Sequence, residues 1–402
     1  RQRRAAVTSP VRAVARAGRT GWARLTVLAA FALAGGLVGC ASSKPTPAPL
    51  EPLTPTIAGK QVWQQRLGAP FTALSVAVVT VPTGAGPAGS AERFVLASRD
   101  GDVVSYDAAT GLERERVALG VKLSAGVGSD GRFHAVVSDD SDLIVVEGGR
   151  QRWRLRLPSR VVTAPLVAGE RVFVQLVDRT IQGYDVLDGR KLWSLPRGGE
   201  PLALAQPGVL LAYKDTLLAG QGARLVGIDP LLGTVRSEVA FTAQRGTNEV
   251  ERLSDLVGPA ARIGDVVCAR AFQSSVACLQ ADRGTTLWSR NLGGYQGLTA
   301  DAEFVVAGDG SDRLTAWKRA SGDLAWTNAR LRNRSLSAPL LSGSTLVVGD
   351  FEGWLHFLSR DRGEPLLRLP TDSSGIAAPL VRAGTTLLAV TRSGGVYAFR
   401  PQ

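Results

Sequence analysis

The sequence lacks methionine altogether and holds only two histidines and three cysteines in 402 residues. His134 and His356 lie far apart in the chain, and neither stands at a metal-ligand spacing or beside a nucleophile that it could activate. No two cysteines are adjacent. We therefore expect no catalytic residues, no metal ligands and no resident cofactor, which predicts a protein that is not an enzyme. The missing methionine includes the initiator, whose position the sequence leaves open.

Helical periodicity and acidic residues are absent from defined parts of the chain. Past residue 60 no stretch keeps a 3.6-residue apolar period long enough for a helix, and no acid precedes residue 40. Seven of the 47 basic residues lie in that N-terminal part, so the rest holds 40 basic and 35 acidic residues, a formal charge of +5. Because these charges are interspersed and no basic run is flanked by aromatics, we expect no nucleic-acid partner.

Residues 1–39 have the layout of a secretory signal peptide. Basic residues up to Arg24 precede an apolar run of about fifteen residues, shorter than the roughly 20 that a bilayer span needs. The run ends in Leu37-Val38-Gly39-Cys40, which matches the lipobox of bacterial lipoproteins. We expect cleavage before Cys40 and acylation at that residue, since two or more acyl chains suffice for stable anchoring. The alternative is an ordinary cleavage site with a chance cysteine.

Residues 40–58 would then be the lipidated start of the mature chain and a Pro-rich tether. The segment is expected to be semi-extended and to have no core of its own. Position 41 is Ala and not Asp, which in lipoproteins generally favours transport to the outer membrane. We therefore expect a lipid-anchored protein on the periplasmic face of the outer membrane of a Gram-negative bacterium, touching the membrane through its lipid only.

From residue 59 onward one unit of four short alternating strands recurs about every 40 residues. Segment 164–196 sets the unit out, 337–370 is a near copy, and 377–402 stops before its fourth strand. A glycine ends the turn before the fourth strand in seven units: Gly111, Gly149, Gly189, Gly233, Gly284, Gly322 and Gly363. Such repeats are typical of β-propellers. We predict an all-β, eight-bladed β-propeller of four-stranded antiparallel blades over residues 59–402. Its ring would close by pairing the N-terminal strand in 59–68 with the C-terminal blade; seven blades is the alternative.

A tryptophan follows a turn glycine by four residues at five places: Gly59/Trp63, Gly149/Trp153, Gly189/Trp193, Gly284/Trp288 and Gly322/Trp326. The glycine suits a turn and the indole can pack between neighbouring blades, so we expect the pair to be architectural. Three units carry Glu115, Ser237 or Leu367 at the tryptophan position. Two insertions, 80–93 and 240–255, are expected to be long loops, where propellers carry function.

Cys268 and Cys278 flank one hairpin, and an oxidising periplasm would allow them to join. The residue numbers 268 and 278 have an even sum. Two such residues can lie directly opposite each other in a hairpin only if the loop has an odd number of residues, or if a bulge shifts the register. We expect the related hairpin at Glu352-Gly353 to have a two-residue loop, which would give an odd sum. A disulfide therefore requires a three-residue loop or a bulge here, and otherwise the two are small buried apolar residues.

The Tyr-Asp-x-x-x-Gly-x-x-x-Trp repeat resembles the PQQ repeat of quinoprotein dehydrogenases. Those enzymes hold pyrroloquinoline quinone and Ca²⁺ and typically carry an adjacent Cys-Cys pair, which this chain lacks. The lipobox, the segments 249–255 and 346–366, "DSSG" at 372–375 and the final half-repeat are more similar to the propeller lipoproteins of the β-barrel assembly machinery. That resemblance covers essentially the whole chain.

The second resemblance implies a non-enzymatic scaffold that binds the POTRA domains of the barrel-forming, BamA-type subunit. Other lipoproteins of the complex, and nascent outer-membrane β-barrel chains, are further implied partners. The family's contact loops correspond here to Leu195, Arg197 and Asp255, while Pro196 and Val257 stand where the family commonly has Leu and Asp. A PQQ-dependent dehydrogenase, or a propeller that binds another envelope component, are the alternative functions.

Overall fold

The computed structural model describes residues 45–69, 75–82, 89–197, 204–242 and 253–402. The predicted signal peptide and Cys40 lie outside the described residues. Residues 47–402 form one compact unit, which is described here by itself. Its described residues contain strands and no helix, and they build eight four-stranded antiparallel sheets. None of the described segments contains a helix long and apolar enough to span a membrane.

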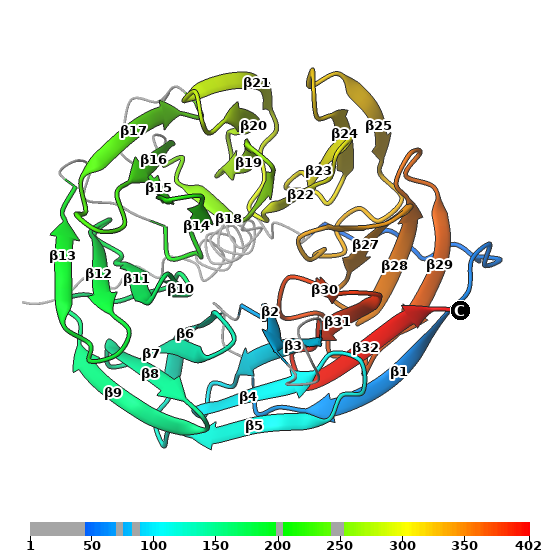
Figure 1. Cartoon of the computed structure of the whole chain (residues 1–402). Coiled ribbons are helices and arrows are strands. Elements are labelled where there is room, and N and C mark those ends of the chain that lie inside the picture. Colours follow the sequence, from blue (N-terminus) through cyan, green and yellow to red (C-terminus); the bar gives the residue numbers. More distant parts are fainter. Residues whose placement is uncertain (1–44, 70–74, 83–88, 198–203, 243–252) are drawn as a thin grey trace, which may run out of the picture. The chain divides into compact units, whose positions relative to one another are not determined.

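The sheets are the blades of a propeller, arranged as a ring with the first strand of each blade innermost (Figure 1). Blades 1 to 4 consist of β2 (Ala77–Pro82), β3 (Ser90–Ala97), β4 (Asp102–Asp107) and β5 (Glu113–Ala118); β6 (Leu123–Ser129), β7 (Phe133–Ser138), β8 (Asp142–Glu147) and β9 (Arg150–Arg156); β10 (Leu166–Ala168), β11 (Arg171–Gln175), β12 (Ile181–Asp185) and β13 (Lys191–Leu195); and β14 (Leu210–Tyr213), β15 (Thr216–Gln221), β16 (Arg224–Ile228) and β17 (Val235–Ala240). Blades 5 to 8 consist of β18 (Leu256–Ile263), β19 (Val266–Ala271), β20 (Ser275–Gln280) and β21 (Thr285–Asn291); β22 (Leu298–Ala300), β23 (Phe304–Gly308), β24 (Leu314–Lys318) and β25 (Leu324–Asn328); β26 (Leu340–Ser342), β27 (Thr345–Gly349), β28 (Trp354–Ser359) and β29 (Pro365–Pro370); and β30 (Val381–Ala383), β31 (Thr386–Val390) and β32 (Gly395–Pro401), completed by β1 (Gly59–Arg66).

Ring closure follows the prediction, and the count is eight blades and not seven. β1 pairs antiparallel with β32, from Gly59 opposite Pro401 to Arg66 opposite Gly395. The C-terminal blade therefore obtains its outer strand from the start of the propeller. This pairing covers the edge of β32, which would otherwise expose a row of unpaired backbone groups.

The burial pattern along the strands explains the pattern of apolar and polar residues in the sequence. The middle strands are almost continuously buried, as in β4 and β7, because each face packs against a neighbouring blade. The outer strands alternate between exposed and partly buried residues, as in β5 and β9. Several innermost strands, such as β10 and β22, are only three residues long, which limits the free edge that faces the axis.

The alternating direction of the four strands gives the ring two different faces. Turns between the second and third strands, and the linkers between blades, lie on one face, which we call the linker face. Turns between the first and second, and the third and fourth, strands lie on the other, which we call the turn face. The turn glycines such as Gly233 are therefore on the turn face.

Each of the five tryptophans joins its own blade to the next. Trp193 of β13 in blade 3 lies against Gly233 of blade 4, where a Cβ atom would come within 2.6 Å of the indole. Its Nε1 donates to the carbonyl of Pro230 at 3.0 Å. The same indole bond, always to the residue three before the turn glycine, is made by Trp63, Trp153, Trp288 and Trp326. The prediction of an architectural role between blades is confirmed by this geometry.

Glu115 makes a polar version of the same junction between blades 1 and 2. Its carboxylate accepts the backbone N–H of Gly149, the turn glycine of blade 2. The other carboxylate oxygen lies 3.2 Å from Nε2 of buried His134. The hydrogen bond with His134 lowers the pKa of Glu115 despite its burial. A histidine that a sequence reader could take for a catalytic group is thus part of a blade contact.

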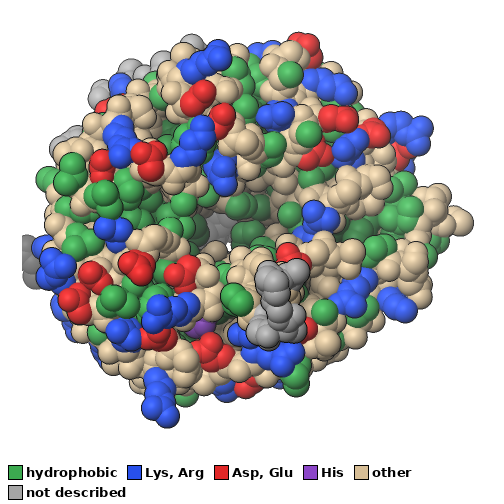
Figure 2. All heavy atoms as spheres, viewed as in Figure 1, with side chains coloured by type: hydrophobic (Ala, Val, Ile, Leu, Met, Phe, Trp, Pro, Cys, Tyr) green, Lys and Arg blue, Asp and Glu red, His purple; other side chains and the backbone are tan. Residues whose placement is uncertain are grey.

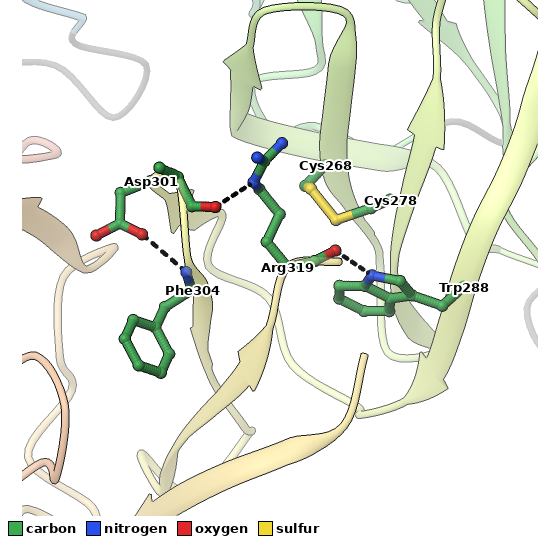
Figure 3. Close-up of a disulfide and its surroundings, with 7 residues drawn as sticks. Cys268, Cys278, Trp288, Asp301, Phe304 and Arg319 are labelled. Atoms are coloured by element: carbon green, nitrogen blue, oxygen red, sulfur yellow. Dashed lines mark hydrogen bonds between the residues drawn. A yellow bond between two sulfur atoms is a disulfide. The ribbon is translucent and has the colours of Figure 1, made fainter. Parts of the chain in front are cut away.

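Cys268 and Cys278 form a disulfide across β19 and β20 (Figure 3). They are directly opposed in the register, and Ala271 pairs with Ser275, which leaves a loop of three residues. The three-residue alternative of the sequence analysis is therefore the one observed. Both cysteines are fully buried beside Trp288, whose Nε1 donates to the carbonyl of Arg319 in blade 6.

One expected loop requires correction at its ends. The segment 80–93 begins and ends within strands, since Ala77–Pro82 and Ser90–Ala97 pair as β2 and β3; residues 83–88 lie outside the described residues. Residues 47–58 belong to the segment 40–58, which the sequence predicts to be a semi-extended tether with no core of its own. The structure shows in addition that Leu50 packs against a hydrophobic cluster that includes Trp326 and Leu358, and that backbone bonds tie the segment to blade 7 and to the linker that precedes it.

Candidate functional site

The two charged residues predicted to bind a partner lie on the linker face. Arg197 follows β13 at the start of the linker from blade 3 to blade 4, and Asp255 directly precedes β18 of blade 5. The linker before blade 4 therefore carries Arg197, and the linker after it carries Asp255. Most of the predicted insertion 240–255 lies outside the described residues, as do residues 198–203.

Arg197 is held by two side chains of blade 4. Its Nη2 lies 2.7 Å from Oε1 of Glu238, and its Nη1 donates to Oε1 of Gln221 at 3.2 Å. The hydrogen bond from Arg197, opposed by burial, lowers the pKa of Glu238. Arg224 adds a second cation 3.2 Å from the same carboxylate oxygen. Since two arginines share Glu238, this part of the surface carries a net positive charge.

Asp255 is held by a cation from the turn between β11 and β12. Its Oδ1 lies 2.9 Å from Nη2 of Arg179, and both side chains are about 15% exposed. Its Oδ2 accepts the backbone N–H of Leu204 at 2.9 Å. Its own carbonyl accepts the N–H of Phe272, in the loop of the disulfide-linked hairpin. Blades 3 and 5, and the linker between blades 3 and 4, thus all contribute to the position of Asp255.

Gln221 connects the two ion pairs. It is almost fully buried at the end of β15, and while its oxygen accepts from Arg197, its Nε2 donates to the backbone carbonyl of Arg179 at 2.8 Å. Arg179, Arg197, Gln221, Glu238 and Asp255 therefore form one connected polar group, which we call the blade 3–5 network. Arg197 and Asp255 were found from the sequence, whereas the other three members were not.

Leu195 and Val257 have a different setting from the charged residues. Leu195 ends β13 opposite Ile181 and is partly buried against the hydrophobic cluster between blades 3 and 4. Val257, at the position where the resembling family commonly has Asp, is 2% exposed. The exposed polar groups near the network therefore belong mainly to Arg197 and its ionic partners, whereas Leu195 contributes to the apolar contact between blades 3 and 4.

The centre of the ring is hollow, and the cavity there has a volume of about 960 Å³. Figure 2 shows this hollow, with apolar and uncharged surface around it and charges of both signs further out. The described lining comes from strand starts and linkers of several blades, and Arg392 is the one charged residue in it. Pyrroloquinoline quinone carries three carboxylates and binds with Ca²⁺, which takes several oxygen ligands. Among the described residues, no three His, Cys, Asp or Glu side chains are placed so that they could hold a metal ion together. The described lining thus does not fit this cofactor.

A second buried polar cluster lies on the linker face of blade 7. Asp350 is fully buried and accepts from Nε of Arg334 at 2.8 Å and from Nε2 of His356 at 3.0 Å. Burial lowers the pKa of His356 in spite of this carboxylate. Burial opposes the ionisation of Asp350, but the hydrogen bonds from His356, Trp354 and Arg334 hold its pKa below the ordinary value. The charges are matched internally, as in a structural cluster.

The closed ring and its repeated Trp-to-Gly contacts define the class: an eight-bladed propeller built from PQQ-type repeats. A family model described as "Outer membrane protein assembly factor BamB" matches residues 99–328. The BamB of Burkholderia pseudomallei is 33% identical over 371 residues, which cover 90% of this chain and 94% of that relative. The BamB of Bordetella pertussis is 33% identical, over 77% of this chain and 81% of its own length. The chain belongs to the BamB family.

Solved structures agree with the fold. The crystal structure of BamB from Moraxella catarrhalis superposes with a TM-score of 0.75 at 23% identity, over 85% of this chain and all of that one. The quinohemoprotein alcohol dehydrogenase of Comamonas testosteroni superposes with a TM-score of 0.62 at 14% identity, over 85% of this chain and 76% of that one. At these identities both comparisons concern the fold alone.

Proposed function

We propose that the chain is a non-enzymatic scaffold lipoprotein of outer-membrane β-barrel assembly. In this proposal Cys40 carries the lipid anchor, and the linker face binds POTRA domains of the barrel-forming, BamA-type subunit and so aids the insertion of outer-membrane proteins. Membership of a family whose members are named outer membrane protein assembly factors supports the role. The observation that carries the binding surface is the blade 3–5 network, which joins Arg197 and Asp255 through Gln221 and Arg179.

The network suits a binding surface because its charges are fixed before a partner arrives. Arg197 is held between Gln221 and Glu238, so less side-chain entropy is lost when its guanidinium meets a carbonyl or carboxylate. Asp255 is held by Arg179 and remains partly exposed for a basic group. Neighbouring positive and negative groups in fixed positions favour one orientation of the partner.

The test is co-purification of POTRA domains with charge-reversal variants. Arg197→Glu and Asp255→Lys are each expected to weaken binding about ten-fold or more, because interface charges that pair with a partner are worth roughly 2 kcal/mol or more. Glu238→Gln is the matched control: it removes the negative charge beside Arg197 but keeps an oxygen that can accept from the guanidinium, so binding should weaken much less than in Arg197→Glu. Arg150→Glu, on exposed β9, controls for net charge.

Unchanged binding in Arg197→Glu and Asp255→Lys, with thermal midpoints near the wild type, would overturn the assignment of these residues. Failure of the wild-type protein to retain POTRA domains at all would overturn the scaffold function. A separate measurement tests the proposed lipid anchor. Mass spectrometry of the mature N-terminal peptide should find acyl chains on Cys40, and an unmodified cysteine would contradict the lipoprotein assignment.

A further inference from the structure

Residues 47–58 lie along blade 7 and are tied to it at both ends. At the linker face, the N–H of Ala48 donates to the carbonyl of Arg332 at 2.9 Å, and the carbonyl of Ala48 accepts from Nη1 of Arg334 at 3.0 Å. Near the turn face, the N–H of Thr56 donates to the carbonyl of Leu366 at 2.9 Å. The segment therefore crosses the full height of β29, beside which it is drawn in blue in Figure 1. We call it the strap.

Side chains of the strap divide into two sets. Ala48, Leu50, Leu53 and Ile57 are partly buried, whereas the prolines 47, 49, 52 and 55 are exposed. Leu50 packs against the hydrophobic cluster of blades 6 and 7. Proline restricts the unbound chain to extended conformations, so docking the strap costs less conformational entropy than docking a flexible linker would.

The residue that holds the strap at the linker face is itself fixed. Arg334 is 3% exposed, and its guanidinium also bonds to the fully buried Asp350. The carbonyl of Ala48 is thus bonded by a rigid cation and not by a mobile surface side chain. In the middle of the strap, Arg368 donates to the carbonyl of Glu51 at 3.3 Å. Charge-assisted bonds of this kind are stronger than neutral ones.

We propose that the strap fixes the point where the anchor leaves the propeller and holds the linker face toward the bilayer. This rests on the proposed lipid anchor at Cys40. Seven residue steps lead from Cys40 to Pro47, a reach of about 25 Å when fully extended, against about 60 Å for the eighteen steps from Cys40 to Ala58. The chain leaves at Ala48, on the same face as Arg197 and Asp255. The partner surface is therefore kept close to the membrane and directed toward it.

Amide hydrogen exchange of the full chain tests the docking. In the wild type, the N–H of Ala48 should exchange at least about ten-fold more slowly than that of exposed Thr54, since only the former is bonded within the fold. Leu50→Asp places a charge against an apolar cluster and should remove this protection while propeller amides keep theirs. Thr54→Asp adds the same charge at an exposed position and should leave it unchanged. Equal exchange at Ala48 and Thr54 in the wild type would overturn the docked strap.

Energy transfer to lipid tests the orientation. A fluorophore is attached to Arg392→Cys, on the linker face, or to Ser344→Cys, on the turn face, both exposed. The lipoprotein is bound to phosphatidylethanolamine and phosphatidylglycerol vesicles that carry acceptor lipids. Transfer should be at least about two-fold stronger from position 392, and Leu50→Asp should abolish the difference because a longer tether permits many orientations. Equal transfer from both positions in the wild type would overturn the proposed orientation.

The two experiments separate this inference from the proposed function. Hydrogen exchange at Ala48 depends on the strap alone and requires no lipid. Failure of the protein to bind vesicles would contradict the anchor at Cys40, and the orientation proposal would fall with it, but the docked strap would stand. Loss of POTRA binding in Arg197→Glu leaves both measurements unaffected.

Discussion

The indole of Trp193 lies on Gly233, the turn glycine of the following blade. Gly233 has a φ of 71°, and a Cβ atom on it would come within 2.6 Å of the ring. The indole N–H donates to the carbonyl of Pro230, three residues earlier. One glycine thus both forms the turn and leaves room for a ring from outside its own blade. This relation accounts for the tryptophan of the Gly-x-x-x-Trp spacing, because each of the five rings lies on the turn glycine of the next blade. The glycine of the same unit receives a ring only where the previous blade supplies one, as at Gly189 and Gly322.

Trp193→Ala should destabilise the propeller by roughly 3–5 kcal/mol, because it leaves a cavity between blades 3 and 4. The ring is only 8% exposed, so little of its contact area is shared with water. Chemical denaturation measures the change. Leu232→Ala, in the turn that Trp193 contacts but 69% exposed, is the control and should have almost no effect. Equal midpoints for Trp193→Ala and the wild type would refute an architectural role for the tryptophan.

Gly233→Ala and Gly264→Ala form a matched pair. Both glycines have φ near the left-handed value, 71° and 60°, but a Cβ on Gly264 meets nothing within 4 Å. Gly264→Ala should therefore show only the cost of the backbone conformation, about 1–2 kcal/mol. Gly233→Ala should cost more, because the methyl group must displace Trp193 as well. The difference between the two unfolding free energies measures the contact, and it should disappear when both changes are made in a Trp193→Ala background.

The repeat in the sequence was sufficient to predict the blades and the closure of the ring. Turn glycines need a positive φ, and the spacing of Gly111, Gly149 and their successors therefore marks every third turn. The repeat could not reveal that the strap docks, since residues 47–58 belong to no unit. The sequence also predicted a two-residue loop for the related hairpin at Glu352-Gly353, and this is wrong: Gly349 pairs with Leu355 and the N–H of Asp350 donates to the carbonyl of Trp354, which leaves three residues, as in the Cys268–Cys278 hairpin.

Arg197 and Asp255 were predicted from the resemblance to the family's contact loops, whose positions they occupy. Their partners were missed because the contacts join different blades. Arg179 meets Asp255 across 76 positions, and Glu238 meets Arg197 across 41. The spacing of residues within one repeat unit cannot predict contacts between residues of different blades. The place of Arg179 in the turn between second and third strands would have assigned it to the linker face, once the strand directions were known.

The disulfide should stabilise the chain by about 3 kcal/mol in the loop-entropy description, given the sequence separation of 10 between Cys268 and Cys278. Unfolding of the wild type in the presence of reductant should show a lower midpoint than in its absence. The double variant Cys268→Ala/Cys278→Ala should resemble the reduced protein and should not respond to reductant. A wild type whose midpoint is independent of reductant would contradict a disulfide in the folded chain.

The cluster of His356 and Asp350 gives the protein a predictable acid sensitivity. Burial lowers the pKa of His356, so the unfolded chain takes up this proton at higher pH than the folded one. The stability due to neutral His356 is therefore complete above the ordinary His pKa of about 6.5 and is lost as the pH falls toward the lowered value. Asp350, whose pKa is also lowered, acts in the same direction at lower pH, below about 4. Arg334 and Arg368 face the same cluster and stay charged throughout, so they do not reverse the sign.

We therefore expect the unfolding free energy to fall between pH 6.5 and pH 5, by at most about 1.4 kcal/mol per pH unit for this one proton. Urea midpoints at pH 7.5, 6.5, 5.5 and 5.0 measure it. His356→Gln keeps a donor for Asp350 but cannot titrate, so its curve should be flatter over this range, even if its stability at pH 7.5 is lower. His134→Gln, in the other histidine–carboxylate pair, tests whether the effect belongs to blade 7. If His356→Gln and the wild type lose stability equally on acidification, the proton is taken up elsewhere and the assignment to His356 is wrong.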